Sequence, residues 1–186
     1  MATTTTATTA TRNADDEEEG QRDRFLVMLR HGIAEEKTDA KRDEERSLTS
    51  DGHARMKMIA KGIERAFPKA QAIYSSPLLR SVQTALWVSK GYRSRIKVNT
   101  TDALIPGAST TEFAEFINGI KERRAIVVGH EPNLSNNLTE LIGLPSSDAV
   151  ELKKGGCYGV RLRTDGTALL EWLLSPRILR KLVESE

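Results

Sequence analysis

Cysteine, long apolar runs and excess charge are all scarce in this 186-residue chain. Its single cysteine, Cys157, excludes an internal disulfide and fits a reducing compartment, so we expect a cytoplasmic protein. No apolar run approaches the roughly 20 residues that span a membrane. The formal net charge of +2 is too small to indicate nucleic-acid binding. With 38% hydrophobic and 29% charged residues, the composition is that of an ordinary globular protein.

Charge is distributed unevenly along the chain. Of its 28 basic and 26 acidic residues, three and six fall within residues 1–24, which leaves 25 basic against 20 acidic residues. Residues 1–14 are nearly all Thr and Ala, and an acidic run follows, so we expect 1–22 to be a disordered tail and 23–186 a single domain. An organelle-targeting peptide is the alternative for this tail. The mildly basic remainder suits an anionic substrate, although a mixed solvated surface gives the same count.

Five apolar residues at 25–29 run directly into Arg30, His31 and Gly32. Such a run predicts a strand buried on both faces, as in parallel sheets, and open α/β sheets bind ligands at the carboxyl ends of their strands. Arg30 offers a planar fork of donors for phosphate oxygens, and His31 offers an imidazole that is largely neutral, hence nucleophilic, near pH 7. Gly32 lacks the Cβ that would keep a ligand away from the backbone. The triplet is common by chance and needs partners from other strands.

Strand and helix patterns alternate after this strand, which indicates an α/β protein with a mostly parallel sheet. The predicted strands are short, at 71–75, 96–99 (an edge strand) and 125–128. Helices are expected to start at Thr49–Asp51, at Ser76–Pro77, at the capping-box pair Ser109 and Glu112, and after Pro132. We expect the second of these helices to carry proline in its first position and to bury Leu79, Val82 and Leu86.

The last 40 residues have a different pattern. Strands are expected at 150–153, 156–163 and 167–174, and Asp165–Gly166 is typical of a hairpin turn between the last two. A helix is expected at 177–183. The mostly parallel sheet therefore ends in an antiparallel edge hairpin.

Three predicted strand ends carry residues suited to an anion. The first supplies Arg30 and His31, the second is followed by Arg80, and the third by His130. Because parallel strands present their carboxyl ends at one edge, two arginines and two histidines should converge there, beside the helix starts expected at Ser76 and Pro132. A helix N-terminus favours anions. This combination predicts a phosphate site.

These ordered motifs resemble the histidine phosphatase superfamily, and most closely its small SixA-type phosphohistidine phosphatases. The resemblance covers residues 25–182 and rests on the segments 29–32 (LRHG), 46–49 with Gly52, 75–85 (SSPLLRSVQTA), 128–135 (VGHEPNLS) and 172–176 (WLLSP). Two features depart from the family. Ser47 stands where proline is frequent, and the helical insertion of the larger mutase and bisphosphatase relatives is missing between Arg80 and His130. Its absence predicts an open pocket without an evident proton donor.

The resemblance implies a phosphoglycerate mutase-like fold, a three-layer α/β/α arrangement with a mostly parallel central sheet. It also implies that His31 attacks phosphorus to form a phosphohistidine intermediate, which water then hydrolyses. Arg30 and Arg80 would clamp the phosphoryl oxygens, and His130 would be the second histidine of the pocket. No cofactor and no metal are expected.

Four further residues are expected to contact substrate: Gly32, Arg46 at the entrance, Ser76 with the backbone at its helix start, and Glu131. Three glutamates are alternative proton donors: Glu131, Glu35 and Glu36. Glu131 could instead only cap the helix that follows it.

Several functional alternatives stay open at this point. The expected partner is a protein carrying phosphohistidine, because an imidazole leaving group needs a strong general acid less than a sugar alcohol does. A small phosphorylated metabolite is the second candidate, and a non-catalytic phosphate-binding module the third. A metal site at the two histidines is disfavoured, since no carboxylate or cysteine follows at metal-like spacing. No nucleic acid or membrane partner is expected, and we expect a monomer.

Overall fold

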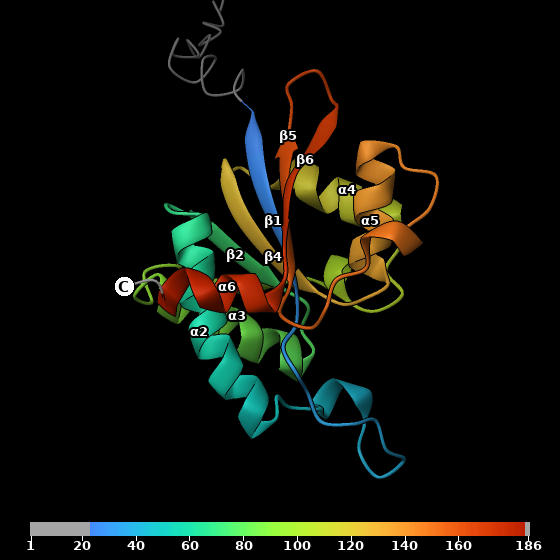
Figure 1. Ribbon diagram of the computed structural model, residues 1–186. Helices are drawn as coiled ribbons and strands as arrows, with labels where there is room; N and C mark the ends of the chain where they lie inside the picture. Colours follow the sequence, from blue (N-terminus) through green and yellow to red (C-terminus); the bar gives the residue numbers. More distant parts are fainter. Residues whose placement is uncertain (1–22, 185–186) are drawn as a thin grey trace, which may run out of the picture.

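The computed structural model describes residues 23–184, so the tail expected at 1–22 lies outside the described residues. A six-stranded sheet with strand order β3-β2-β4-β1-β5-β6 forms the centre (Figure 1). Its strands are β1 Arg24–Arg30, β2 Ala72–Ser75, β3 Val98–Thr100, β4 Arg124–Gly129, β5 Cys157–Leu162 and β6 Ala168–Leu174. The first four are parallel, whereas β5 is antiparallel to β1 and to β6. The expected mostly parallel sheet with an antiparallel edge hairpin is confirmed.

Helices cover both faces of the sheet and give three layers (Figure 1). One face carries α2 Ser50–Ala66, α3 Leu79–Gly91 and α6 Pro176–Glu184, and the other carries α4 Thr110–Gly119 and α5 Asn133–Ile142. Three short 3-10 turns complete the described elements: η1 Asp43–Glu45, η2 Asp102–Leu104 and η3 Asp148–Val150. Within residues 23–184, no helix combines the length and the apolar character needed to cross a membrane.

The two central strands β1 and β4 explain the apolar runs of the sequence. Because successive side chains point to opposite faces, Val27 and Leu29 pack toward α2 and α3, while Leu26 and Met28 pack toward α4 and α5. All four are buried. Burying one such side chain contributes about 1.5–3 kcal/mol, so the strand that ends at His31 is anchored firmly from both sides.

Helix α2 starts and packs as its sequence pattern predicts. The Thr49 side chain accepts a hydrogen bond from the Gly52 amide and caps the helix. Met56, Ile59 and Ile63 form its buried stripe. The capping box at Ser109 and Glu112 and the left-handed Gly143 that ends α5 are confirmed as well.

One predicted helix start and one predicted strand are wrong. Helix α3 begins at Leu79, not at Ser76–Pro77, because residues 76–78 form a turn in which the Leu78 amide donates to Ser76 Oγ. The stretch 150–153 is no strand: η3 ends at Val150, and the Leu152 amide donates to a Glu131 carboxylate oxygen instead of a ladder partner.

The buried face of α3 also differs from the one expected. Leu79 and Leu86 are exposed, and Val82 is half-buried. Four of the six buried residues of the helix are polar or charged: Arg80, Ser81, Thr84 and Ser89. Arg80, Ser81 and Thr84 lie in the first turns of α3, at the carboxyl edge of the sheet, so the orientation of the helix reflects the polar site as well as hydrophobicity.

Candidate active site

The carboxyl ends of β1, β2 and β4 meet at one edge of the sheet. Arg30 is paired with Gly129, and the next amide, that of His31, donates to the Gly129 carbonyl at 3.1 Å. On the other side of β4, the Ser76 amide donates to the Val128 carbonyl at 2.9 Å. The segments after all three strands are thus held side by side, which brings the His31 and His130 rings to a centroid separation of 5.0 Å.

His31 is oriented by its own neighbour. Its Nδ1 lies 2.7 Å from the Gly32 carbonyl oxygen, and because a carbonyl only accepts, Nδ1 carries the proton and Nε2 is left with a lone pair. Burial is the main reason that the pKa of His31 falls to about 3, and the positive charges of Arg80 and Arg30 add to it against the raising effect of the Gly32 hydrogen bond. At neutral pH the ring is uncharged and Nε2 is nucleophilic.

His130 is held by two serine hydroxyls. Its Nε2 lies 2.9 Å from Ser76 Oγ and 3.2 Å from Ser81 Oγ, while its Nδ1 is buried without a hydrogen-bond partner among the described residues. Burial lowers the pKa of His130 to about 3, with smaller contributions from His31 and Arg80. The site therefore contains two neutral imidazoles in contact, one of which has an unused polar atom.

Arg80 is buried, with 4% of its surface exposed, and is held by the loop before α2. Its Nη1 donates to the Asp43 carbonyl at 2.7 Å and its Nη2 to Asp43 Oδ2 at 2.8 Å. Arg46 donates to the other carboxylate oxygen, Oδ1, at 2.7 Å and to the Glu35 carbonyl at 2.8 Å. Arg46 thus reaches the site through Asp43 and Arg80, as part of one charged network.

Arg30 reaches toward the segment after η3. Its guanidinium donates to the Leu152 carbonyl and lies 3.5 Å from Glu151, an exposed carboxylate. Its Nε is buried without a partner among the described residues. Arg30 and Arg80 each engage protein acceptors through part of the guanidinium and keep further N–H groups, which is what oxyanion binding requires.

The other predicted contact residues have more structural roles than expected. A Cβ on Gly32 would lie 2.7 Å from the Met56 side chain, so core packing also disfavours a side chain at this position. The Ser76 amide is used by β4, and its hydroxyl orients His130. Helix α3 starts at Leu79, later than expected and without a side-chain cap, and Glu131 accepts the Ser135 amide in the first turn of α5 at 3.2 Å.

The candidate proton donors are mostly engaged. Glu131 accepts from Ser135 and from the Leu152 amide, so it caps α5 and fixes the loop after η3. Hydrogen bonds from Lys41 and then Ser47 lower the pKa of Glu35 to about 2. Glu36 is exposed. Glu35 and Glu131 thus serve as hydrogen-bond acceptors that hold neighbouring segments in place.

Four residues of the site were not predicted from the sequence: Asp43, Ser81, Thr84 and Lys154. Asp43 precedes Arg46 by three residues, the spacing of an ion pair across one helical turn, so this pair could have been predicted from the sequence. Ser81 and Thr84 share the α3 face of Arg80, and Thr84 Oγ1 accepts the Gly32 amide at 3.0 Å. Lys154 contributes a positive charge that lowers the pKa of His31; no pattern in the sequence singled it out.

The arrangement suits a phosphate group. Two neutral imidazoles are surrounded by the positive charges of Arg30, Arg80 and Lys154, and the open hollow beside Arg30 and Glu131 has a volume of about 480 Å³. Among residues 23–184, no group of three or more His, Cys, Asp or Glu side chains could hold a metal ion. The fold and the site together define an α/β protein with an arrangement suited to a phosphoryl group at the carboxyl edge of its sheet.

Comparison with known proteins agrees with this class. The sequence model of the histidine phosphatase superfamily (branch 1) matches residues 26–105, the part of the chain that runs from β1 past η2. A protein of Picosynechococcus sp. described as uncharacterized is 28% identical over 139 residues, covering 73% of this chain and 84% of its own.

Solved structures share the fold. The putative phosphohistidine phosphatase SixA from Agrobacterium tumefaciens aligns with a TM-score of 0.70 at 23% identity, covering 82% of this chain and 98% of the other. A mycobacterial glucosyl-3-phosphoglycerate phosphatase aligns with a TM-score of 0.64 at 17% identity, covering 83% of this chain and all of the other. The phosphoglycerate mutase-like, SixA-like fold expected from the sequence is therefore confirmed.

Proposed function

We propose that this protein is a metal-independent phosphatase that uses His31 as its nucleophile and removes phosphate from phosphohistidine in a protein. The observation that carries the proposal is the neutral His31 ring, with Nδ1 held by the Gly32 carbonyl and Nε2 free, 5.0 Å from a second neutral ring. The SixA likeness supports the phosphohistidine substrate.

The reaction proceeds in two displacements. His31 Nε2 attacks the phosphorus of the substrate in line, an Nε2–P bond forms, and the P–N bond to the substrate imidazole breaks. The electron pair of that bond leaves with the substrate imidazole, which takes a proton from solvent. Water then attacks the phosphorylated His31, the Nε2–P bond breaks, and inorganic phosphate leaves with the free enzyme restored.

Charge stabilisation comes from the surrounding side chains. Arg30 and Arg80 bind the equatorial oxygens, where negative charge is spread in the transition state. His130, oriented by Ser76 and Ser81, donates a hydrogen bond to the same group. Because the charges of the two guanidiniums are fixed before the substrate arrives, little reorganisation is needed during the reaction.

The carboxylates around the site favour a substrate that needs little acid assistance. Burial raises the pKa of Asp43, but hydrogen bonds from Arg46 and Arg80 outweigh it and leave the pKa below its ordinary value. Glu35 accepts the Ser47 amide and Glu131 accepts the Ser135 and Leu152 amides, so these carboxylates are already engaged as acceptors. An imidazole leaves more readily than an alkoxide, which is why we place phosphohistidine ahead of sugar phosphates.

A small phosphate monoester is the second candidate. The mycobacterial glucosyl-3-phosphoglycerate phosphatase has the same fold, and the open hollow of about 480 Å³ beside Arg30 leaves room for a small ester next to the proposed site. The two candidates share every step at His31 and differ only in the leaving group, so relative rates separate them.

The test is a comparison of kcat/KM in the presence of a metal chelator. The substrates are a histidine-phosphorylated phosphotransfer protein, p-nitrophenyl phosphate and 3-phosphoglycerate. We expect turnover of the first two and a preference of at least about tenfold for the phosphohistidine protein over the sugar acid phosphate. The reverse preference would establish the small-ester candidate. Phosphate binding without turnover of any substrate would contradict catalysis altogether.

A further inference from the structure

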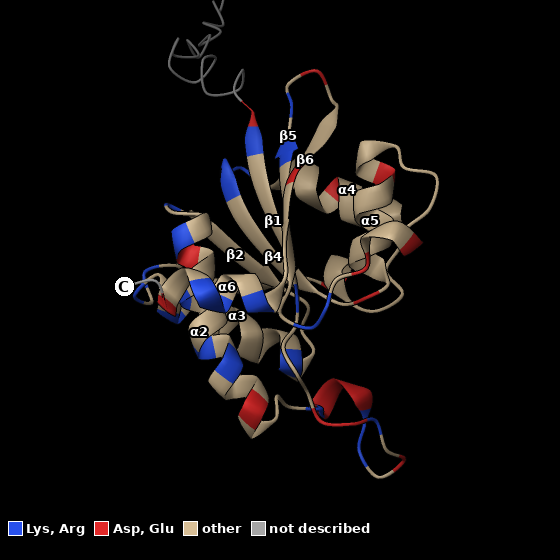
Figure 2. Ribbon diagram, viewed as in Figure 1, with Lys and Arg blue, Asp and Glu red and all other residues tan. Residues whose placement is uncertain are grey.

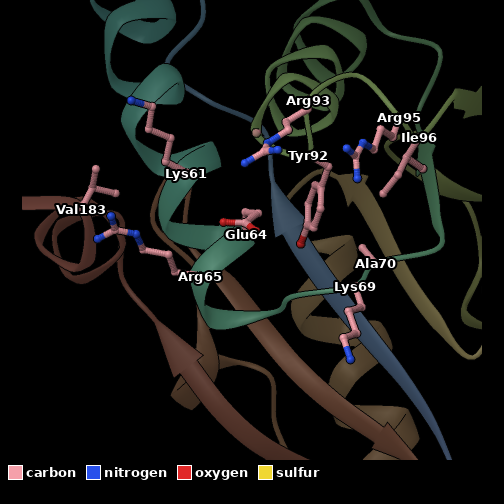
Figure 3. Close-up of a pocket in the computed structure, with 11 residues that line it drawn as sticks. Lys61, Glu64, Arg65, Lys69, Ala70, Tyr92, Arg93, Arg95, Ile96 and Val183 are labelled. Atoms are coloured by element: carbon pink, nitrogen blue, oxygen red, sulfur yellow. The ribbon is translucent and has the colours of Figure 1, made fainter.

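The largest hollow described lies away from the two histidines. It is a groove of about 850 Å³ between the last turns of α2, the end of α3 with its following turn, and the end of α6 (Figure 3). Its lining contains five basic side chains and one acidic: Lys61, Arg65, Lys69, Arg93, Arg95 and Glu64. Figure 2 shows basic residues gathered at this end of α2 and α6. The groove therefore attracts anions.

The topology places this groove at the opposite end of the sheet from the proposed active site. Helices α2 and α3 run antiparallel to the strands they cover, so their last turns lie at the strands' amino ends, whereas the histidines follow the carboxyl ends. A ligand in the groove leaves the phosphoryl site open, and the proposal below does not depend on the proposed function.

The backbone at the rim of the groove provides an independent observation. Lys69 and Arg93 have φ angles of 63° and 57°, in the left-handed region that L side chains rarely adopt. At positions just past a helix, glycine adopts this conformation at a lower cost. Both turns instead carry a long cation, so conformational strain accompanies the positive charge at the mouth of the groove. Such strain is often found at binding sites.

The chain itself contains a complementary anion. Residues 15–19 are five consecutive carboxylates, the same number as the basic side chains that line the groove. They precede Asp23 by four to eight residues, and an extended chain spans at most about 3.5 Å per residue, so they can reach roughly 14–28 Å from it.

The start of β1 lies close enough to the groove for this reach. The Arg124 guanidinium lies 5.5 Å from the centroid of the Phe25 ring and 4.1 Å from that of the Phe67 ring. The Arg124 Nε also donates to the Pro68 carbonyl at 3.1 Å. Lys69, at the groove's rim, is the next residue. One side chain therefore connects the region where the acidic run arrives with the turn that lines the groove.

We propose that the acidic run Asp15–Glu19 docks intramolecularly into the basic groove between α2, α3 and α6. The short tether gives the run an effective concentration in the millimolar range, well above the concentration of a typical free acidic protein. The bound carboxylates lie against Lys61, Lys69, Arg93 and Arg95, and Glu64 limits how deeply they enter.

Zero-length carbodiimide coupling of the full chain tests this contact directly, because it joins a carboxylate to a lysine amine only in contact. After trypsin, all five carboxylates fall in the single peptide 13–22. We expect this peptide to be joined to Lys61 or Lys69. Lys121 is the matched reference, because it lies two residues from Arg123, whose guanidinium donates to the Asp23 carbonyl at 3.0 Å. Equal coupling at Lys121 and the groove lysines would overturn the proposal.

Charge variants provide the control. The double variant R93G/R95E removes two cations, and glycine suits the left-handed position 93, so the fold is spared. We expect coupling of peptide 13–22 to the groove lysines to fall on the order of tenfold in this variant. A similar fall is expected for the parent chain in 1 M salt, which screens the charges. The variant R163E, an exposed charge reversal on the β5–β6 hairpin, should couple like the parent chain. Unchanged coupling in R93G/R95E would contradict docking, and so would hybrid products in a mixture of isotope-labelled and unlabelled chains.

Discussion

The two histidines owe their chemistry to single contacts around each ring. The Gly32 carbonyl fixes the tautomer of His31, and Ser76 and Ser81 hold His130. Burial keeps both rings neutral, and the neutral form is the nucleophilic one. One backbone carbonyl and two hydroxyls therefore orient the reacting rings before any substrate binds.

The variant His31→Ala should lose turnover of p-nitrophenyl phosphate by at least about 10³-fold, since no other group can form the Nε2–P bond. His53→Ala is the matched control. His53 lies on α2 and accepts a hydrogen bond from the Trp87 indole at 3.0 Å, and the turnover rate of its variant should stay within about twofold of the parent rate. Initial rates of the parent and the two variants, measured in the presence of a metal chelator, provide the comparison. Comparable rates in the His31 variant would refute the nucleophile assignment.

The ring resonances of His31 and His130 should show no titration between pH 8 and pH 5. Their pKa values of about 3 lie below this range, whereas an ordinary histidine changes charge near pH 6.5. Proton NMR of the imidazole Cε1–H groups, assigned with His31→Asn and His130→Asn, measures this. An inflection near pH 6.5 for either ring would show that burial does not keep the pair neutral.

Whole helices and loops hold these residues in place. The loop of η1 is held against α3 because one carboxylate, Asp43, bridges Arg46 and Arg80. Helix α3 in turn buries Arg80, Ser81 and Thr84 and exposes two leucines. Hydrophobic periodicity alone predicts the opposite face of this helix. The error is physical in origin: a helix that lines a polar site satisfies its buried polar groups with partners far away in the sequence, which a local pattern does not contain.

Asp43→Ala should release the loop of η1 from α3. The variant removes two charge-assisted hydrogen bonds that hold the segment 35–47, so its backbone amides should exchange with deuterium about tenfold faster. Hydrogen exchange with mass spectrometry measures this. The control is Asp51→Ala, which breaks the exposed ion pair to Arg55 on α2. Equal protection in the Asp43 variant and the parent would mean that the bridge does not hold the loop.

At the scale of the whole molecule, features that depend on neighbouring residues were predicted from the sequence, whereas contacts between distant segments were not. The apolar runs of β1 and β4, the cap of α4 and the turn at Asp165–Gly166 depend on neighbouring residues, and all were predictable. The convergence of Arg30, His31, Arg80 and His130 followed from parallel strands and the family resemblance. The Asp43 bridge and the packing reason for Gly32 depend on contacts between distant segments, so no local pattern contains them.

Global stability should fall as the pH is lowered from 6.5. Both histidines have a folded-state pKa near 3 and an unfolded pKa near 6.5, so between these values the unfolded chain binds protons that the folded chain does not. The expected loss is about 2 kcal/mol between pH 6 and pH 5 for the pair. Urea unfolding at several pH values measures it. In the double variant His31→Asn with His130→Asn, the free energy of unfolding should depend less on pH. An identical pH dependence in the variant and the parent would contradict the lowered pKa values of the two histidines.

The central claim is that His31 Nε2 receives the phosphoryl group between two guanidiniums and a second imidazole. It is tested most directly by rapid quenching of the protein with a histidine-phosphorylated substrate, followed by trypsin and mass spectrometry at alkaline pH. Cleavage after Arg30 leaves His31 as the only histidine of the peptide 31–37. The account predicts an acid-labile, base-stable phosphate on that peptide, absent in His31→Ala. Phosphate on any other residue, or turnover without a phosphorylated peptide 31–37, would contradict it.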